Sequence, residues 1–294
     1  MEEDTLTSVT LADGRLIAYE EVGDPAGVPL FVLHGTPGSR LSSLHQNPSR
    51  VADAGLRVIT YDRPGYGRSG RHRGRRVVDC VPDVAAIADE LALEHFAVTG
   101  GSGGGPHALA VGARLPRRVT RVLCTVSGAP FDADLNWFEG MDRTNVREFG
   151  WALEGEETLS RELQREAQET LAGLEEDPAA LFRDIDLAPA DRAALEDEDL
   201  RQGLSRSLRE ALREGVWGWV DDDLAFINPW GFDVSELQVP VEVRYGSADV
   251  LVPPTHGAWL AAHIRNAVVT VEADAGHLAT PDEHLARLKA FVAA

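Results

Sequence analysis

The chain has few of the residues that cross-link a small protein or hold a metal ion. Its 294 residues include 2 cysteines, too few for a disulfide framework, and no Cys/His cluster has metal-ligand spacing. No apolar stretch approaches the ~20 residues that cross a bilayer. The N-terminal sequence MEEDTLTS also lacks the basic and apolar regions of a secretion signal. We therefore expect a cytoplasmic protein that uses no metal and no other cofactor.

Positive charge is also scarce. The net charge is −20, and such a charge repels phosphate groups, which argues against nucleic acid and anionic membranes as partners. The acidity is uneven, because residues 131–232 hold 26 acidic residues against 10 arginines and so carry −16 of the total. We expect a small-molecule substrate, and the acidic segment makes a cationic one worth testing. The choice between monomer and homodimer stays open.

Short apolar runs alternate with helical spacing in two parts of the chain. A length of 294 residues with 44% hydrophobic composition can bury a substantial core. Uninterrupted apolar runs are typical of strands in a parallel sheet that is covered on both faces. We expect such strands at 30–34, 57–61, 96–99, 119–126, 241–245 and 268–271, a hairpin at 5–10 and 16–21, and helices at 81–93, 104–115, 253–264 and 281–292.

The middle of the chain has a different pattern. Residues 131–232 show no convincing strand but contain two long amphipathic segments, at 156–176 and 191–214. The sequence therefore predicts one doubly wound α/β core from residues 1–130 and 233–294, with residues 131–232 inserted as a helical unit.

The sharpest local motif is a serine among glycines. Gly100-Gly101-Ser102-Gly103-Gly104 directly follows an expected strand and precedes an expected helix. This is the setting of the G-x-S-x-G turn, which exposes a nucleophile and needs neighbours without side chains. A second turn, His34-Gly35-Thr36-Pro37, follows the strand at 30–34. The backbone N–H groups of Thr36 and Gly103 are candidates for an oxyanion hole, whereas Pro37 has no N–H to donate.

A serine nucleophile needs a base, and the base needs an orienting acid. His277 lies in the loop between the last expected strand and helix, where a base is required, and Asp249 follows the strand at 241–245. The order Ser102, Asp249, His277 is the nucleophile–acid–base order of one hydrolase fold. His34, which precedes a glycine near the candidate oxyanion loop, fits a structural hydrogen-bonding role better than the role of the base. The rival acids are Asp132 and Asp134, while Asp274 is too close to the loop of His277 to be preferred.

Taken together, these motifs resemble those of the α/β-hydrolase superfamily along essentially the whole chain. The matching segments are HGTPGS (34–39), YDRPGYGRS (61–69), GGSGGG (100–105), the run at 246–254 and AGHL (275–278). The resemblance implies an eight-stranded, mostly parallel sheet with a helical cap at residues 131–232. It also implies Ser102 as nucleophile, His277 as base, Asp249 as orienting acid, and Thr36 and Gly103 as oxyanion donors.

Some segments are similar to particular branches of that superfamily. The HGTP loop resembles that of epoxide hydrolases, but those enzymes use an aspartate nucleophile, and Ser102 argues against them. The DRPGYGRS segment resembles prolyl aminopeptidases, which usually carry a bulky aromatic residue where this chain has Gly103. The six arginines between 63 and 76 fit a solvated loop better than an anion site.

The expected cap holds five of the six tryptophans. Such residues either line a substrate pocket or form the cap's own small core. The pocket candidates are His34, Trp137, Trp217 and Trp230. The run Asp221-Asp222-Asp223 either binds a substrate ammonium group or, as is more usual, forms a solvated helix face.

The sequence thus predicts a serine hydrolase that cleaves a carboxylic ester of a small molecule through an acyl-enzyme. An aminopeptidase or amidase is the main alternative. Two further alternatives also stay open, since fold does not fix function. One is a ligand-binding protein that keeps the three residues but turns its ligand over slowly, and the other is a lyase or isomerase on the same fold.

Overall fold

The computed structural model describes residues 6–265 and 267–294. Its eight-stranded sheet has the order β1-β2-β4-β3-β5-β6-β7-β8. β1 and β2 pair antiparallel, as do β2 and β4, and all other neighbours are parallel. The predicted doubly wound, mostly parallel α/β sheet is therefore confirmed. The strands are β1 Ser8–Thr10, β2 Leu16–Gly23, β3 Val28–Leu33, β4 Leu56–Tyr61, β5 Phe96–Gly101, β6 Val119–Thr125, β7 Val241–Gly246 and β8 Val268–Glu272.

The expected hairpin forms between β1 and β2, with Val9 opposite Ile17. Residue 5, which the sequence placed in its first strand, lies outside the described residues. The helices are α1 Pro48–Asp53, α2 Val81–Glu90, α3 Gly104–Arg114, α4 Arg143–Glu154, α5 Glu156–Gly173, α6 Pro189–Ala194, α7 Glu198–Ala211, α8 Trp217–Ile227, α9 Pro254–His263 and α10 Pro281–Ala293. None of these described helices combines the length and apolar character that crossing a bilayer requires.

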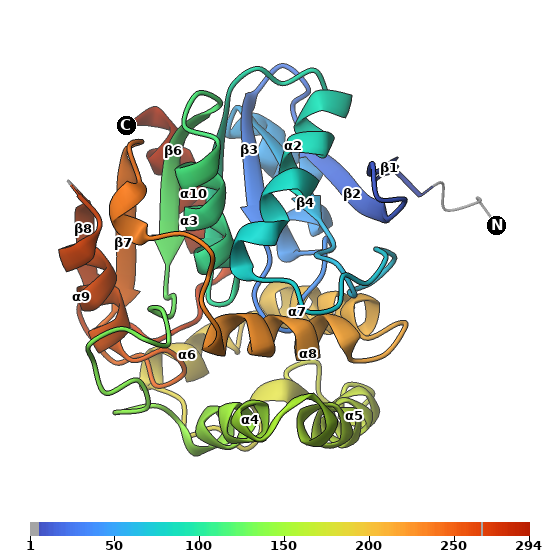
Figure 1. Ribbon diagram of the computed structural model, residues 1–294, viewed down its shortest axis with the longest axis vertical. Coiled ribbons are helices and arrows are strands. Elements are labelled where there is room, and N and C mark those ends of the chain that lie inside the picture. The colour runs from blue at the N-terminus through green and yellow to red at the C-terminus, as the bar shows by residue number, and fades with distance from the viewer. Residues whose placement is uncertain (1–5, 266) are drawn as a thin grey trace.

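Both faces of the sheet are buried. On one face, α2, α3 and α9 cover Phe31, Val98 and Val243, while on the other α1 and α10 cover Leu30, Val58 and neighbours. Figure 1 shows the two helical layers on either side of the strands. The uninterrupted apolar runs follow from this double cover, because successive side chains of a strand point to opposite faces.

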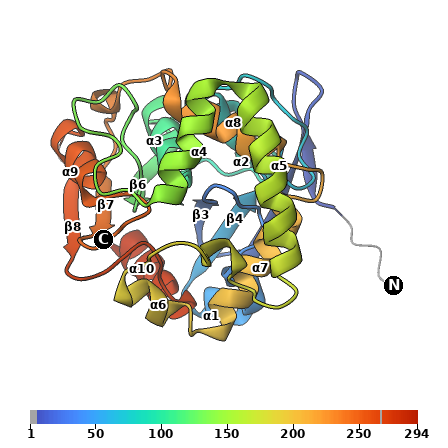
Figure 2. The same cartoon turned by 90° about the horizontal axis from the view of Figure 1, so that it is seen from below.

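Five helices, α4 to α8, lie between β6 and β7 and contain the acidic segment. They gather beyond one end of the strands, and the view from below looks past them onto β3 and β4 (Figures 1 and 2). We call the segment from residue 131 to residue 232 the insertion.

The sequence pattern predicted one long amphipathic segment at 191–214, but the structure contains two helices there, α6 and α7. Asp197 caps α7 by accepting a hydrogen bond of 2.8 Å from the Leu200 amide, so α7 begins anew after the turn that ends α6. The sequence pattern also missed α8, because its apolar residues and its three aspartates do not separate onto two faces and therefore give little amphipathic periodicity.

Candidate active site

Ser102 sits on a tight turn between β5 and α3. Its φ of +54° is in the left-handed region, which side chains rarely adopt. The turn is held by the Ser102 amide, which donates to the Thr125 carbonyl, and by the Ser127 hydroxyl, which donates to the Ser102 carbonyl. A Cβ on Gly104 would lie 2.2 Å from the Leu33 carbonyl oxygen. The neighbouring glycines thus let the backbone make a turn that presents Ser102 to the cavity described below.

His277 and Asp249 come together from loops that follow β8 and β7. Nδ1 of His277 lies 2.8 Å from Oδ2 of Asp249, and because a carboxylate only accepts, Nδ1 carries the proton and Nε2 is left to accept another. The Asp249 carboxylate is 3% exposed. Its Oδ1 accepts from the amides of Leu251 and Val252, both at 2.9 Å, so this acid is fixed in place.

The electrostatics of the pair favour a charged imidazole. Burial alone lowers the pKa of His277, but the charge of Asp249 and its hydrogen bond outweigh burial, and the pKa is raised above 6.5. The rival acids Asp132 and Asp134 are exposed, as is Asp274, and Asp134 instead accepts from the Trp259 indole.

The candidate oxyanion donors lie on neighbouring turns. The Thr36 side chain packs against Gly103 so closely that a Cβ on Gly103 would lie 2.2 Å from Thr36 Oγ1. This contact explains why the residue after Ser102 is glycine in this chain. Within the described part of the chain, no acceptor is bonded to the backbone N–H of either residue. Both amides are therefore available for a ligand.

His34 and Arg63 hold the loop that carries Thr36. Nε2 of His34 accepts from the Arg63 amide at 3.1 Å, so Nδ1 bears the proton and donates to the Gly35 carbonyl at 2.7 Å. Burial, with the charge of Arg63, lowers the pKa of His34 well below 6.5 and keeps the ring neutral. The Arg63 guanidinium donates to the carbonyls of His34 and Gly35. His34 also lines the cavity described below.

Asp222 of α8 is the centre of a buried charge network. Its carboxylate accepts from Thr36 Oγ1 at 2.7 Å, from Arg63 Nη2 at 2.6 Å and from the Tyr66 hydroxyl at 2.9 Å. Arg75 Nη2 lies 2.7 Å from the other oxygen. Burial would raise the pKa of Asp222, but the two arginines outweigh it and hold the pKa well below 3.8. The insertion is thus bound directly to the Thr36 loop.

This network corrects two expectations. Asp221, Asp222 and Asp223 do not form a solvated face, because each is at most 1% exposed. The arginine segment is a solvated loop only in part, since Arg73 and Arg76 are exposed but Arg63 and Arg75 are buried against Asp222. One signal was present in the sequence, because the three adjacent acids stand between the apolar runs WGWV and LAFI, and charges buried among apolar residues need partners.

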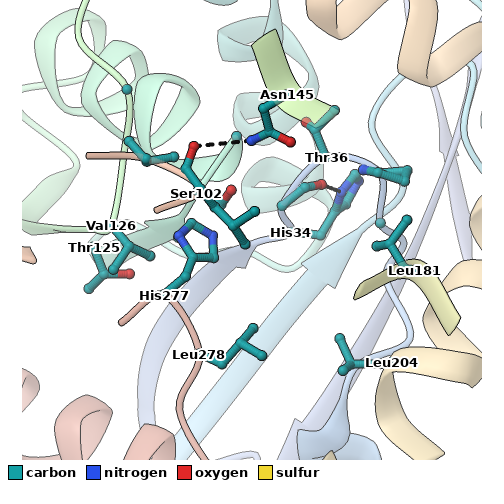
Figure 3. Close-up of a pocket in the computed structure, with 18 of the residues that line it drawn as sticks. His34, Thr36, Ser102, Thr125, Val126, Asn145, Leu181, Leu204, His277 and Leu278 are labelled. Carbon is teal, nitrogen blue, oxygen red and sulfur yellow. Dashed lines mark hydrogen bonds between the residues drawn. The ribbon is translucent and has the colours of Figure 1, made fainter. Parts of the chain in front are cut away.

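A cavity of about 640 Å³ lies between the strand ends and the insertion. Ser102, His277, Thr36 and Gly103 line it, and Figure 3 shows the His277 ring beside Ser102 with Leu181, Leu204 and Leu278 farther along the wall. This volume suits a small organic ligand. Within the described residues, no group of three or more His, Cys, Asp or Glu side chains is arranged to hold a metal ion.

The expected tryptophans are divided between the cavity and the insertion surface. Trp137 and Trp230 line the cavity, as does Trp219, which the sequence analysis did not select. Trp217, by contrast, does not line the cavity, and the Arg71 guanidinium lies over its ring, 4.1 Å from the ring centroid. Trp217 and Trp219 are two residues apart on α8 and therefore point to different sides of the helix.

Glu148 of α4 and Asp223 of α8 form a second feature of the cavity wall. Neither oxygen of Asp223 has an N–H donor or a hydroxyl donor within the described chain. The two carboxyl groups instead lie close enough for the charge of one to affect the other. Burial raises the pKa of Glu148 to about 7, and burial and the charge of Glu148 raise that of Asp223 well above 3.8. Both shifts favour the protonated acids, so the pair holds less negative charge at neutral pH than two ordinary carboxylates would.

The sheet order, the turn after β5 and the loops after β7 and β8 define a hydrolase-type α/β fold. The chain belongs to the alpha/beta hydrolase fold family, whose model matches residues 28–283.

The chain is also similar, at low sequence identity, to curated proteins. The chain is 28% identical over 268 residues to the dihydrolipoyllysine-residue acetyltransferase component of an acetoin cleaving system from Pseudomonas putida, covering 90% of this chain and 62% of that protein. It is 29% identical over 133 residues to a proline iminopeptidase from Xylella fastidiosa, covering 43% and 41% of the two chains. The matches thus span less than two thirds of the length of these relatives.

The fold is also that of solved structures. An enol-lactonase from Burkholderia xenovorans LB400 superposes with a TM-score of 0.65 at 20% identity, covering 98% of both chains. This similarity establishes the shared fold.

Proposed function

We propose that the chain is a serine hydrolase that cleaves a carboxylic ester of a small molecule. The observation that carries this proposal is the hydrogen bond of 2.8 Å between His277 Nδ1 and Asp249 Oδ2, in a cavity that Ser102 also lines. Asp249 orients the ring, leaving Nε2 to take the Ser102 proton. The insertion acts as a cap over the site.

The reaction runs in two steps. Ser102 Oγ attacks the ester carbonyl carbon while His277 Nε2 takes its proton, and the backbone N–H groups of Thr36 and Gly103 stabilise the oxyanion. His277 then returns the proton to the departing alcohol, which leaves an acyl-enzyme on Ser102. Water, activated by His277, releases the acid by the same route.

The test is turnover of a panel of p-nitrophenyl acyl esters by the wild type and Ser102→Ala. We expect multiple turnovers by the wild type, a transient acyl adduct on Ser102 by mass spectrometry, and neither with the variant. A single slow turnover would favour the ligand-binding protein instead. Equal turnover by both proteins would contradict the proposal.

A second candidate is an aminopeptidase or amidase, and the Glu148–Asp223 pair favours it. Glu148 and Asp223 are two buried acids of the cavity wall, and a substrate ammonium group offers them up to three N–H donors and a compensating positive charge. α8 places this pair near the nucleophile, because Asp223 lies one turn from Phe226, whose ring packs against Gly103. The local match to proline iminopeptidase agrees with this candidate.

Two substrates and one variant separate the candidates. An aminopeptidase cleaves proline β-naphthylamide far faster than p-nitrophenyl acetate, and an esterase shows the opposite preference. Glu148→Gln keeps an acceptor for the Trp219 indole, which donates to Glu148 at 2.8 Å, but removes the charge. An ammonium subsite predicts at least a tenfold loss of kcat/KM for the amine substrate alone. Equal effects on both substrates would contradict that subsite.

A further inference from the structure

Asp191 is a buried carboxylate of the insertion that lies against the loop carrying His277. It belongs to α6 and is 0% exposed. Its Oδ1 accepts a hydrogen bond of 2.7 Å from the Leu278 amide. A Cβ on Gly276 would lie 2.0 Å from its Oδ2. The carboxylate is thus packed on the residues on both sides of His277.

The second oxygen of Asp191 has no hydrogen-bond donor within the described residues. An isolated buried carboxylate is costly, and a nearby positive charge offsets that cost. The His277 ring supplies such a charge whenever it is protonated, and among the effects that raise its pKa is the charge of Asp191.

The charges of two carboxylates from different parts of the chain therefore act on His277. Asp249 comes from the loop after β7 and makes the direct hydrogen bond. Asp191 comes from the insertion and acts through space and through the loop backbone. The charge of Asp249 also acts on His256, but the His256 ring is held by the Ala129 amide, which donates to Nδ1, and by the Trp137 carbonyl, which accepts from Nε2.

We propose that Asp191 is a positioning residue for the general base, a second acid supplied by the insertion that stabilises the imidazolium of His277. This inference rests on the proposed function, since it requires His277 to gain a proton during the reaction. The charge is useful in the step where His277 has taken the Ser102 proton, because a fixed negative charge in a buried site stabilises the cation that forms. It also connects the base to the insertion, since α6 carries the carboxylate.

The substitution Asp191→Asn separates charge from structure. The Asn carbonyl oxygen can still accept from the Leu278 amide, so the loop keeps its hydrogen bond while the charge is lost. Asp191→Ala removes both. Asp186→Asn is the matched control, because it removes one negative charge from an exposed side chain five residues away.

The measurement is the pH dependence of kcat/KM for an ester that the wild type turns over, with the melting temperature of each variant. In Asp191→Asn we expect the acidic limb of the kcat/KM profile to shift to lower pH. We also expect kcat at neutral pH to fall about three- to tenfold, with KM nearly unchanged. In Asp186→Asn we expect the acidic limb to stay at its wild-type pH. An unchanged limb in Asp191→Asn, with loss of activity in Asp191→Ala alone, would show a purely structural role and overturn the proposal.

A second variant covers the case in which Asp191→Asn does not fold. Gly276→Ala pushes the carboxylate away from the loop and must also shift the acidic limb to lower pH, whereas an unshifted limb overturns the proposal. Absence of activity in the wild type, or activity that survives Ser102→Ala, would instead refute the proposed function. The two failures are therefore distinguishable.

Discussion

The hydroxyl group of Thr36 donates a hydrogen bond of 2.7 Å to the carboxylate of Asp222. This bond joins the loop after β3 to helix α8 of the insertion, although the two residues are 186 positions apart. The loop that carries a proposed oxyanion donor is thus held by a residue that a sequence motif search does not connect with it.

The Thr36 hydroxyl is expected to matter for rate more than for binding. Thr36→Val removes the bond to Asp222 and leaves the loop less well fixed, and small displacements of a catalytic group cost up to about a hundredfold in rate. We expect kcat for an ester substrate to fall about tenfold or more, with little change in KM. Thr36→Ser keeps the hydroxyl and is the control, so equal kcat values for the two variants would refute this role.

Asp222 is expected to be essential for stability. Asp222→Asn leaves Arg63 and Arg75 buried without their counter-charge, and breaking such a pair costs about 3–5 kcal/mol. Urea unfolding measures this loss. The control is Asp89→Asn at the exposed pair with Arg118, where a change below about 1 kcal/mol is expected. Similar losses in both variants would contradict the assigned network.

The pH dependence of stability follows from the same carboxylate. The pKa of Asp222 is well below 3.8 in the folded chain, so its ionised form stabilises the fold above pH 3.8 and this contribution is lost as the pH falls toward the folded-state pKa. We expect the stability difference between wild type and Asp222→Asn to narrow in acid below pH 3.8. A constant difference down to pH 2 would disagree with this linkage.

The pH dependence of activity is expected to follow His277. Its pKa is raised above 6.5, so the base is protonated and inactive below that value, and the acidic limb of kcat/KM lies above pH 6.5. Asp249→Asn removes the charge that raises the pKa, so the limb moves to lower pH, and kcat falls by about 10⁴ through loss of the correct tautomer. Steady-state rates from pH 5 to 9 measure both effects, and a limb that stays in place would be contrary evidence.

The contact between Thr36 and Gly103 gives a paired test. Gly103→Ala brings a Cβ to 2.2 Å from Thr36 Oγ1, so we expect a large loss of esterase activity. Thr36→Gly removes both the Oγ1 and the Cβ that the new side chain meets. The double variant Thr36→Gly/Gly103→Ala is therefore expected to be more active than Gly103→Ala alone, and additive losses would argue against this clash.

The sequence was sufficient to predict what depends on local pattern. Apolar runs located the parallel strands, and the glycine turn selected Ser102. The relations across the insertion were not predictable, because Asp222 and Arg63 are 159 positions apart and only folding shows that the charges meet. Trp217 and Trp219 lie on different faces of α8. Because the sequence pattern did not predict this helix, it could not show which of the two tryptophans points into the cavity.

Labelling of Ser102 tests the central claim most directly. A fluorophosphonate reacts with an activated serine, so incubation of the folded chain followed by peptide mass spectrometry reports on this residue alone. The proposed function predicts one probe per chain, attached at Ser102, no labelling in Ser102→Ala, and slow labelling in His277→Ala. Failure of the folded wild type to react, or labelling that persists in Ser102→Ala, would contradict it.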